Sequence, residues 1–225
     1  MKNNLICSSL LAFGFILINH VYAQVPVREE PHHKVVLENS YVRILNVRIL
    51  PHDTTLAHIH AAASVMVFLS KSNIGTQIVG AQPVISDVVP GQTSYAAYDE
   101  KPIKHRVWNQ GDQSNSLFHV MDIELVKKNP FPDSCAVLSQ PGIKLKWQQK
   151  LVRSYNISVE KGKEYDIPKS NCAYLLIDIS GSVAAIAASN MRIIKESGFI
   201  FFPPQAEIKI SSTNSAAECV LLELK

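Results

Sequence analysis

Two histidines, His58 and His60, stand two residues apart in the stretch LAHIHAAASVMVFL, residues 56 to 69. Side chains alternate faces along a β-strand, so both imidazoles would project to the same side of an extended segment. Two imidazoles presented on one strand can chelate a divalent transition metal. The spacing therefore predicts half of a metal site, and a third ligand must come from another strand.

His105 supplies that third ligand. It lies in a second β-like run, KPIKHRVWN, after PGQTSYAAYDE, which has the character of a turn leading into a strand pair. An HxH pair alone is as typical of a structural or surface pair as of a metal site. The order HxH and then, further along the chain, Pro-x-x-His-x-x-x-Asn is far more specific. We therefore predict that His58, His60 and His105 bind one divalent transition metal (Fe, Mn, Ni, Cu or Zn).

The two segments PHDTTLAHIHAAASVMVFL and PGQTSYAAYDEKPIKHRVWN make the sequence resemble the cupin superfamily. The resemblance covers residues 35–125 well and the remainder loosely. It implies small antiparallel β-barrels, or jelly rolls, with a metal inside and a small organic molecule as ligand or substrate. Because cupins often pair through strand edges, it also implies a homodimer.

One position departs from the cupin pattern. Cupins commonly carry a glutamate ligand four residues after the second histidine, and here that position is Ser64. By strand parity Ser64 faces the same interior as His58 and His60, but a neutral hydroxyl is a poor ligand beside a carboxylate. The resulting set of three neutral imidazoles resembles the three-histidine iron centres of thiol dioxygenases, which are also cupins.

Two functions remain open on this sequence. Open metal positions can bind substrate and dioxygen, which favours an oxygenase-like enzyme acting on a small organic molecule. The missing acidic ligand favours the alternative, a non-catalytic ligand-binding or interaction module whose metal is structural or vestigial. No catalytic residue is assigned. Because the ligand imidazoles must be neutral, we expect metal occupancy to weaken below about pH 6.5.

Three further residues are candidates for a pocket beside the metal: Ser64, Tyr98 and His119. Tyr98 precedes His105 and offers an apolar ring with one hydroxyl, although ordinary strand aromatics are the simpler interpretation. His119 shares a strand face with apolar residues, so it could approach the metal. We favour a hydrogen-bonded core histidine there.

The remaining histidines lie outside the two segments. His32 and His33 precede the first clear strand, where we expect solvent exposure, although a lead-in arm can fold over the mouth of a barrel. His52 occupies a position where a turn glycine would be expected, and we predict that it is exposed.

Short alternating runs must position all these residues. From Val35 onward they include residues 41–49, 65–69 and 117–125, bounded by Pro, Gly, Asn and Asp. Helical periodicity is unconvincing outside the N-terminal region. Such spacing is typical of an all-β sandwich or barrel. With the cupin resemblance, the expected fold is all-β, with two cupin-like antiparallel barrels in one chain.

The second half of the sequence is a faded copy of the first. VRILNVRILPHDTTL, from Val42, can be laid beside VRSYNISVEKGKEYD, from Val152, and ESGFIFFPPQAEIKISSTN follows in the place of the second histidine segment. Internal repetition predicts two similar units. A Pro-bearing segment separates them, so we expect domains at 24–126 and 146–225 with a linker at 127–145.

The second copy has lost the histidines. Pro168 and Ser170 stand at the positions of the HxH pair, Tyr174 at the position of Ser64, and Ile208 near the position of His105. We therefore expect the C-terminal domain to bind no metal and to pack against, or cover, the N-terminal barrel.

The first residues form a separate segment. Residues 5–18 are apolar but too short to span a bilayer at roughly 20 residues, and Val21-Tyr22-Ala23 has the character of a cleavage site. We expect residues 1–23 to be a signal peptide and the mature protein to be periplasmic or secreted, outside the membrane. An uncleaved anchor is the alternative.

Cysteines and charge add two further expectations. Loss of the signal peptide leaves Cys135, Cys172 and Cys219, so oxidation could join one pair, which the sequence does not choose. The 22 Lys and Arg residues are scattered among 19 Asp and Glu residues, with a net charge of +3. This pattern favours a mixed solvated surface and excludes a nucleic-acid-binding face.

Overall fold

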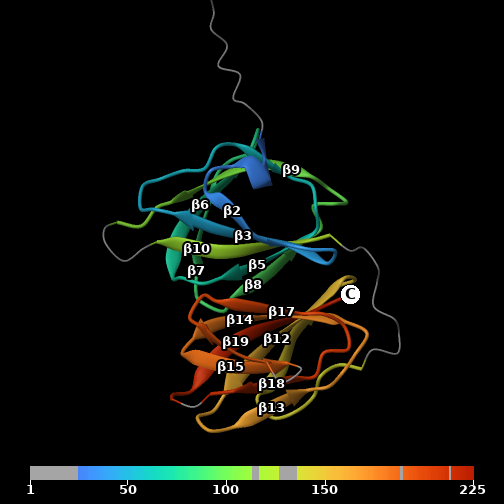
Figure 1. Cartoon of the computed structure of the whole chain (residues 1–225). Coiled ribbons are helices and arrows are strands. Elements are labelled where there is room, and N and C mark those ends of the chain that lie inside the picture. Colours follow the sequence, from blue (N-terminus) through green and yellow to red (C-terminus); the bar gives the residue numbers. More distant parts are fainter. Residues whose placement is uncertain (1–24, 113–116, 127–135, 188–189, 213) are drawn as a thin grey trace, which may run out of the picture.

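The computed structural model describes residues 25–112, 117–126, 136–187, 190–212 and 214–225 (Figure 1). The expected signal peptide and Cys135 lie outside these residues. The described chain consists of β-strands with one short 3-10 helix, η1 (Val27–Glu29), so the predicted all-β class is confirmed. Across these ranges, no helix has the length and apolar character needed to cross a membrane.

The N-terminal half forms two five-stranded sheets, both antiparallel except for the β1–β4 pair. The outer sheet has the order β1 (Val25–Pro26), β4 (His58–His60), β9 (Ile103–Asn109), β6 (Ser72–Ile78) and β7 (Val84–Val88). The inner sheet has the order β2 (His33–Glu38), β3 (Val42–Ile49), β10 (Phe118–Leu125), β5 (Ser64–Phe68) and β8 (Thr93–Ala96). In the described residues these two sheets face each other without joining into one closed barrel, and we call the space between them the barrel interior.

The C-terminal half repeats this topology. Its inner sheet has the order β11 (Ile143–Gln148), β12 (Val152–Val159), β19 (Ala217–Leu224), β14 (Ala173–Ser180) and β17 (Phe199–Phe202). Its outer sheet has the order β13 (Glu164–Ile167), β18 (Ile208–Ser211), β15 (Ser182–Ala187) and β16 (Asn190–Lys195). Strands β3 and β12 begin at Val42 and Val152, the residues at which the two sequence copies align. Strand β11 takes up the end of the segment expected to be a linker.

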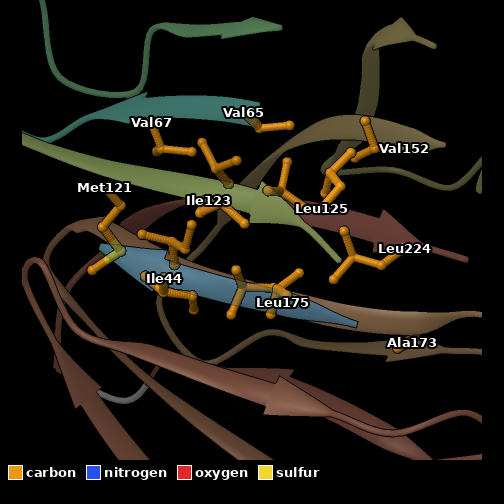
Figure 2. Close-up of a cluster of buried hydrophobic side chains, with 14 of the residues drawn as sticks. Ile44, Val65, Val67, Met121, Ile123, Leu125, Val152, Ala173, Leu175 and Leu224 are labelled. Carbon is orange, nitrogen blue, oxygen red and sulfur yellow. The ribbon is translucent and has the colours of Figure 1, made fainter. Parts of the chain in front are cut away.

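The two inner sheets pack against each other and form a core shared by both halves (Figures 1 and 2). From the N-terminal half, Met121, Ile123 and Leu125 of β10 enter this core, and Leu175 and Leu224 meet them from the C-terminal half. The alternate residues of β10 face the N-terminal barrel. All eight residues of β10 are buried, so this strand is the rigid floor of the barrel.

The interior of the C-terminal barrel is filled by apolar side chains. Ile167 of β13 pairs with Ile208 of β18, and both are buried. The corresponding strands of the N-terminal half pair His58 with His105. The structural counterpart of His58 is therefore Ile167, one residue before the Pro168 that the sequence alignment placed there.

Candidate metal centre

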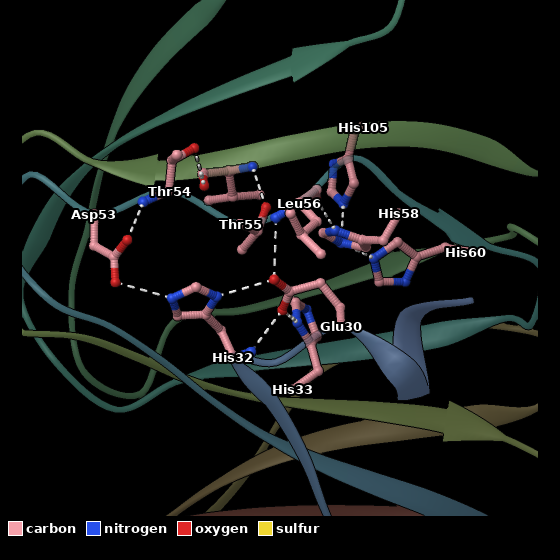
Figure 3. Close-up of polar contacts among 11 residues, drawn as sticks. Glu30, His32, His33, Asp53, Thr54, Thr55, Leu56, His58, His60 and His105 are labelled. Carbon is pink, nitrogen blue, oxygen red and sulfur yellow. Dashed lines mark hydrogen bonds and ion pairs between the residues drawn. The ribbon is translucent and has the colours of Figure 1, made fainter. Parts of the chain in front are cut away.

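Strands β4 and β9 bring the three predicted histidines together inside the N-terminal barrel (Figure 3). His58 lies directly opposite His105, and His60 follows two residues later on the same face of β4. The Nε2 atom of His58 is 3.1 Å from Nε2 of His60 and 3.1 Å from Nε2 of His105. All three side chains are buried, and His58 and His60 share one face of β4, as strand parity predicts.

His33 joins this cluster as a fourth histidine. It is the first residue of β2, its ring centroid lies 4.6 Å from that of His58, and only 7% of its surface is exposed. One nitrogen each of His33, His58 and His60 lie within 4.8 Å of one another. The expectation that His33 is solvent-exposed is wrong, because the lead-in segment folds against the barrel and carries the side chain inward.

His58 and His33 each have a hydrogen-bond acceptor beside Nδ1, which indicates that Nδ1 carries the proton. The Nδ1–H of His58 donates to the carbonyl oxygen of Leu56 at 2.8 Å. Nδ1 of His33 lies 2.5 Å from the carboxylate of Glu30. With the proton on Nδ1, the Nε2 lone pair is left free for a metal, and such outer contacts hold a ligand ring in its binding orientation.

The separation of the Nε2 atoms fits a common metal ion. Two nitrogens 3.1 Å apart, each about 2.1 Å from one ion, subtend an angle of about 95° at that ion. Because His58 donates through Nδ1, its Nε2 is an acceptor, and it faces the Nε2 atoms of both His60 and His105. Neighbouring imidazole nitrogens of this kind are ligands typical of a divalent transition metal.

Burial keeps these rings in the neutral form that binds metals. Desolvation lowers the pKa of His58 to about 4, of His60 to about 2 and of His105 to about 3. The charges that neighbouring histidines would carry lower each pKa further. His58, His60 and His105 are therefore uncharged at neutral pH.

Glu30 is a buried carboxylate that sequence reasoning missed (Figure 3). It accepts hydrogen bonds from the backbone N–H of His32 at 2.8 Å and of Leu56 at 3.1 Å, besides its contact with His33. Burial alone would raise the pKa of Glu30, but the hydrogen bonds of His33 and His32 lower it to about 2. Glu30 thus carries a stable negative charge behind His33. No local sequence pattern marks it.

His32 lies on the outer side of Glu30 and is half-buried. Its Nδ1 contacts Glu30 and its Nε2 contacts Asp53, both at 2.9 Å. Burial would lower the pKa of His32, but these hydrogen bonds raise it. Asp53, His32 and Glu30 therefore form a hydrogen-bonded chain that leads from the surface to His33.

Asp122 places a second carboxylate inside the barrel. It lies on β10, and its Oδ2 is 3.4 Å from Nδ1 of His60. Burial raises the pKa of Asp122 to about 7, the charge of Glu124 adds to the rise, and the nearby Ser64 hydroxyl offsets part of it. Strand β5 has a serine at the position of the expected acidic ligand, while Asp122 on β10 places a carboxyl group beside His60.

A cavity of about 380 Å³ adjoins the histidines. Tyr98 lines it, with its ring centroid 5.1 Å from that of His60. Ser64 is buried on the face of β5 that turns into the barrel, and its hydroxyl donates to the carbonyl of Ala62 at 3.2 Å. Of the candidate pocket residues, the structure therefore brings Tyr98 into the cavity wall and Ser64 near Asp122.

His119 lies apart from the cluster. On β10 it alternates with the barrel-facing residues, and its Nε2 is 2.7 Å from Oδ1 of Asn46. Burial lowers the pKa of His119 to about 4. It has the character of the hydrogen-bonded core histidine that the sequence favoured. His52 is exposed, as predicted, and its φ of 65° is the left-handed value of a glycine-like turn position.

Solved structures share this architecture over most of the chain. A cupin 2 conserved barrel domain protein from Leptotrichia buccalis has a TM-score of 0.56 at 12% identity, with 85% of this chain and 88% of that chain covered. A salicylate 1,2-dioxygenase from Pseudaminobacter salicylatoxidans has a TM-score of 0.62 at 8% identity, with 86% and 76% covered. A variant of that dioxygenase in complex with gentisate has a TM-score of 0.62 at 10% identity, with 88% and 76% covered.

No family model and no curated protein matches the sequence. The structural likeness, at these low identities, concerns the fold. The chain has the cupin fold, as the two histidine segments led us to expect.

Proposed function

We propose that the N-terminal barrel binds one divalent transition metal through His58, His60 and His105, with His33 as a fourth ligand. The observation that carries this proposal is the convergence of Nε2 atoms 3.1 Å apart, on rings that are buried and neutral. The outer contacts of Leu56, Glu30 and Asp122 support it, because each lies on the Nδ1 side of one ligand ring.

We propose further that the site acts on a small organic molecule as an oxygenase-like enzyme. An ion in this position would supply Lewis-acid or dioxygen chemistry. The cavity beside His60 and His105 would hold the molecule and exclude bulk water, and Tyr98, which lines the cavity next to His60, would orient it. The structural similarity to a salicylate dioxygenase, one variant of which was solved in complex with gentisate, supports the proposal that this chain binds a small molecule.

One observation favours the non-catalytic alternative. If His33 binds together with the other three histidines, a tetrahedral ion such as Zn²⁺ has all four positions filled by protein, which is typical of a structural site. A six-coordinate ion would keep two positions open. The identity and geometry of the bound metal therefore separate the two functions.

Metal analysis of the purified full chain tests the site. We expect about one ion per chain and a loss of most of it in His58→Ala and His105→Ala. His119→Ala is the matched control, because it removes a buried histidine outside the cluster. A chain that holds no metal after supplementation, or ligand variants that retain it, would contradict the proposal. Substrate-dependent oxygen uptake by the metal-loaded protein would then favour the enzyme over the module.

We also propose that residues 1–23 direct export and are removed. N-terminal sequencing of the protein recovered outside the cytoplasm should begin at Gln24. A mature chain that retains Met1, or one confined to the cytoplasm, would contradict export.

A further inference from the structure

The walls of the cavity are apolar. Side chains from both sheets of the N-terminal half line it, among them Ile49, Phe68, Ile74, Val107, Phe118 and Val120. A dry apolar cavity of about 150 Å³ holds one benzene ring, so a cavity of 380 Å³ has room for on the order of 10–15 non-hydrogen atoms. The space fits a molecule of one or two rings.

Cationic side chains are absent from this wall. Among the described residues that line the cavity, none is a lysine or an arginine. Arg106 is the neighbour of His105 on β9, but it is exposed and donates to Oε1 of Gln77 at 2.8 Å. A carboxylate placed among these apolar side chains would lose its hydration without gaining a guanidinium or ammonium partner, which is costly.

Asp122 is the acidic group of the cavity. Its side chain is 3% exposed, and the nearby Ser64 hydroxyl donates to the carbonyl oxygen of Ala62, so neither carboxyl oxygen of Asp122 has a hydrogen-bond partner. The Nδ1 atom of His60, 3.4 Å away, also lacks a hydrogen-bond partner. A buried acceptor without a donor is costly, and a ligand hydroxyl or amino group would satisfy it.

From these features we propose that the cavity of the metal-free chain selects a neutral, mainly apolar molecule that donates a hydroxyl or amino hydrogen to Asp122, and that it rejects a carboxylate of the same skeleton. The inference rests on the proposed function in placing this ligand beside the metal site. Recognition itself uses the apolar wall and Asp122. The ligand class therefore differs from salicylate, the carboxylate in the name of the structurally similar dioxygenase.

Three naphthalene derivatives test this selectivity by calorimetry on the full chain, both metal-loaded and chelator-treated. 2-Naphthol offers a hydroxyl donor, 2-methoxynaphthalene keeps the ring and oxygen without the donor, and 2-naphthoate carries the anion. In the chelator-treated chain we expect 2-naphthol to bind at least about tenfold more tightly than either of the other two, because it alone gives the buried, unpaired carboxyl group of Asp122 a donor on an otherwise neutral ring. Equal binding of the ether overturns donor recognition, and equal or tighter binding of the carboxylate overturns anion exclusion. Absence of binding by all three also overturns the proposal.

Asp122→Asn keeps the shape of the side chain and removes its charge. We expect this variant to narrow the preference for 2-naphthol over 2-naphthoate at least threefold, and Asp87→Asn, at an exposed site on β7, to leave it unchanged. An unchanged preference in Asp122→Asn contradicts the role of Asp122. If that variant does not fold, the ligand series on the unmodified chain still decides.

Metal content, measured on the same samples, separates the two proposals. A chain that selects 2-naphthol but holds no metal would contradict the proposed function and support the ligand class. A chain that holds metal but prefers 2-naphthoate after the metal has been removed would contradict the ligand class alone.

Discussion

The carboxylate of Glu30 lies 2.5 Å from Nδ1 of His33, so that Nε2 is the ring nitrogen left for a metal (Figure 3). This contact indicates which nitrogen of His33 is free, and it places the negative charge of Glu30 behind that ring. The lead-in segment is therefore part of the candidate site. Its importance can be measured without altering any histidine.

Glu30→Gln should weaken metal binding about 10–100-fold, the usual effect of losing a partner behind a ligand histidine. The amide keeps the size of the side chain but lacks its charge. A titration against a competing chelator measures the change. Glu29→Gln is the control, because Glu29 is exposed and pairs only with Arg28 among the described contacts. Equal affinities in the two variants would show that the contact does not support a metal ligand.

The metal-free protein should lose stability as the pH falls from 6.5 toward 4. Burial lowers the pKa of His58, His60, His105 and His119 to about 4 or below, whereas an unfolded histidine titrates near 6.5. In this window the unfolded chain binds more protons, so acid favours unfolding. Asp122, Asp178 and His32 act in the opposite direction because their pKa values are raised, but they are three groups against four histidines, and the lowered pKa of Glu30 adds to the effect of the histidines.

Urea unfolding of chelator-treated protein at pH 7, 5.5 and 4.5 measures this dependence. Metal occupancy should follow the same shift. The sequence led us to expect release below about pH 6.5, the value of an unperturbed imidazole, whereas the buried rings resist protonation until the pH is closer to 4. A free energy of unfolding that rises on acidification would contradict the neutral, buried cluster.

Ile123→Ala should destabilise the protein by about 2–5 kcal/mol, because it opens a cavity in the core shared by both halves. Val84→Ala, on the exposed face of β7, should change the free energy of unfolding by less than about 0.5 kcal/mol. Denaturant unfolding compares them. A small effect of Ile123→Ala would mean that the inner sheets do not depend on each other.

Gly75→Ala should also destabilise the protein, by about 1–3 kcal/mol. A Cβ atom at this position of β6 would lie 1.9 Å from the Trp108 ring on the neighbouring strand β9. Removing the ring with Trp108→Ala should abolish the penalty, which a double-mutant cycle can measure. Additive effects of the two substitutions would contradict a direct clash.

The sequence predicted the part of the site that strand parity controls. His58 and His60 share a face because they are two residues apart, and His105 opposes His58 because β9 pairs with β4. His33 and Glu30 could not be predicted in this way. They reach the cluster only after β2 pairs with β3, which sets His33 opposite Val47, and nothing local encodes that distance.

Asp122 escaped prediction for a different reason. In a strand with one solvent-exposed face, polar and apolar residues alternate and indicate which face is interior. Strand β10 is buried on both faces, so its sequence does not indicate which face meets the barrel. The barrel side holds Asp122, and the other side holds His119 among the residues of the shared core. Only the contact between the two halves resolves the choice.

The packing of the two inner sheets gives the C-terminal half, which carries no histidine, a structural role. If the chain were cut after residue 126, the N-terminal half would expose Met121, Ile123 and Leu125 to water as one apolar face. Exposed apolar faces of this kind promote aggregation. The C-terminal half thus covers this face permanently. A substitution that disturbs its packing would act on the cavity of the N-terminal half through β10.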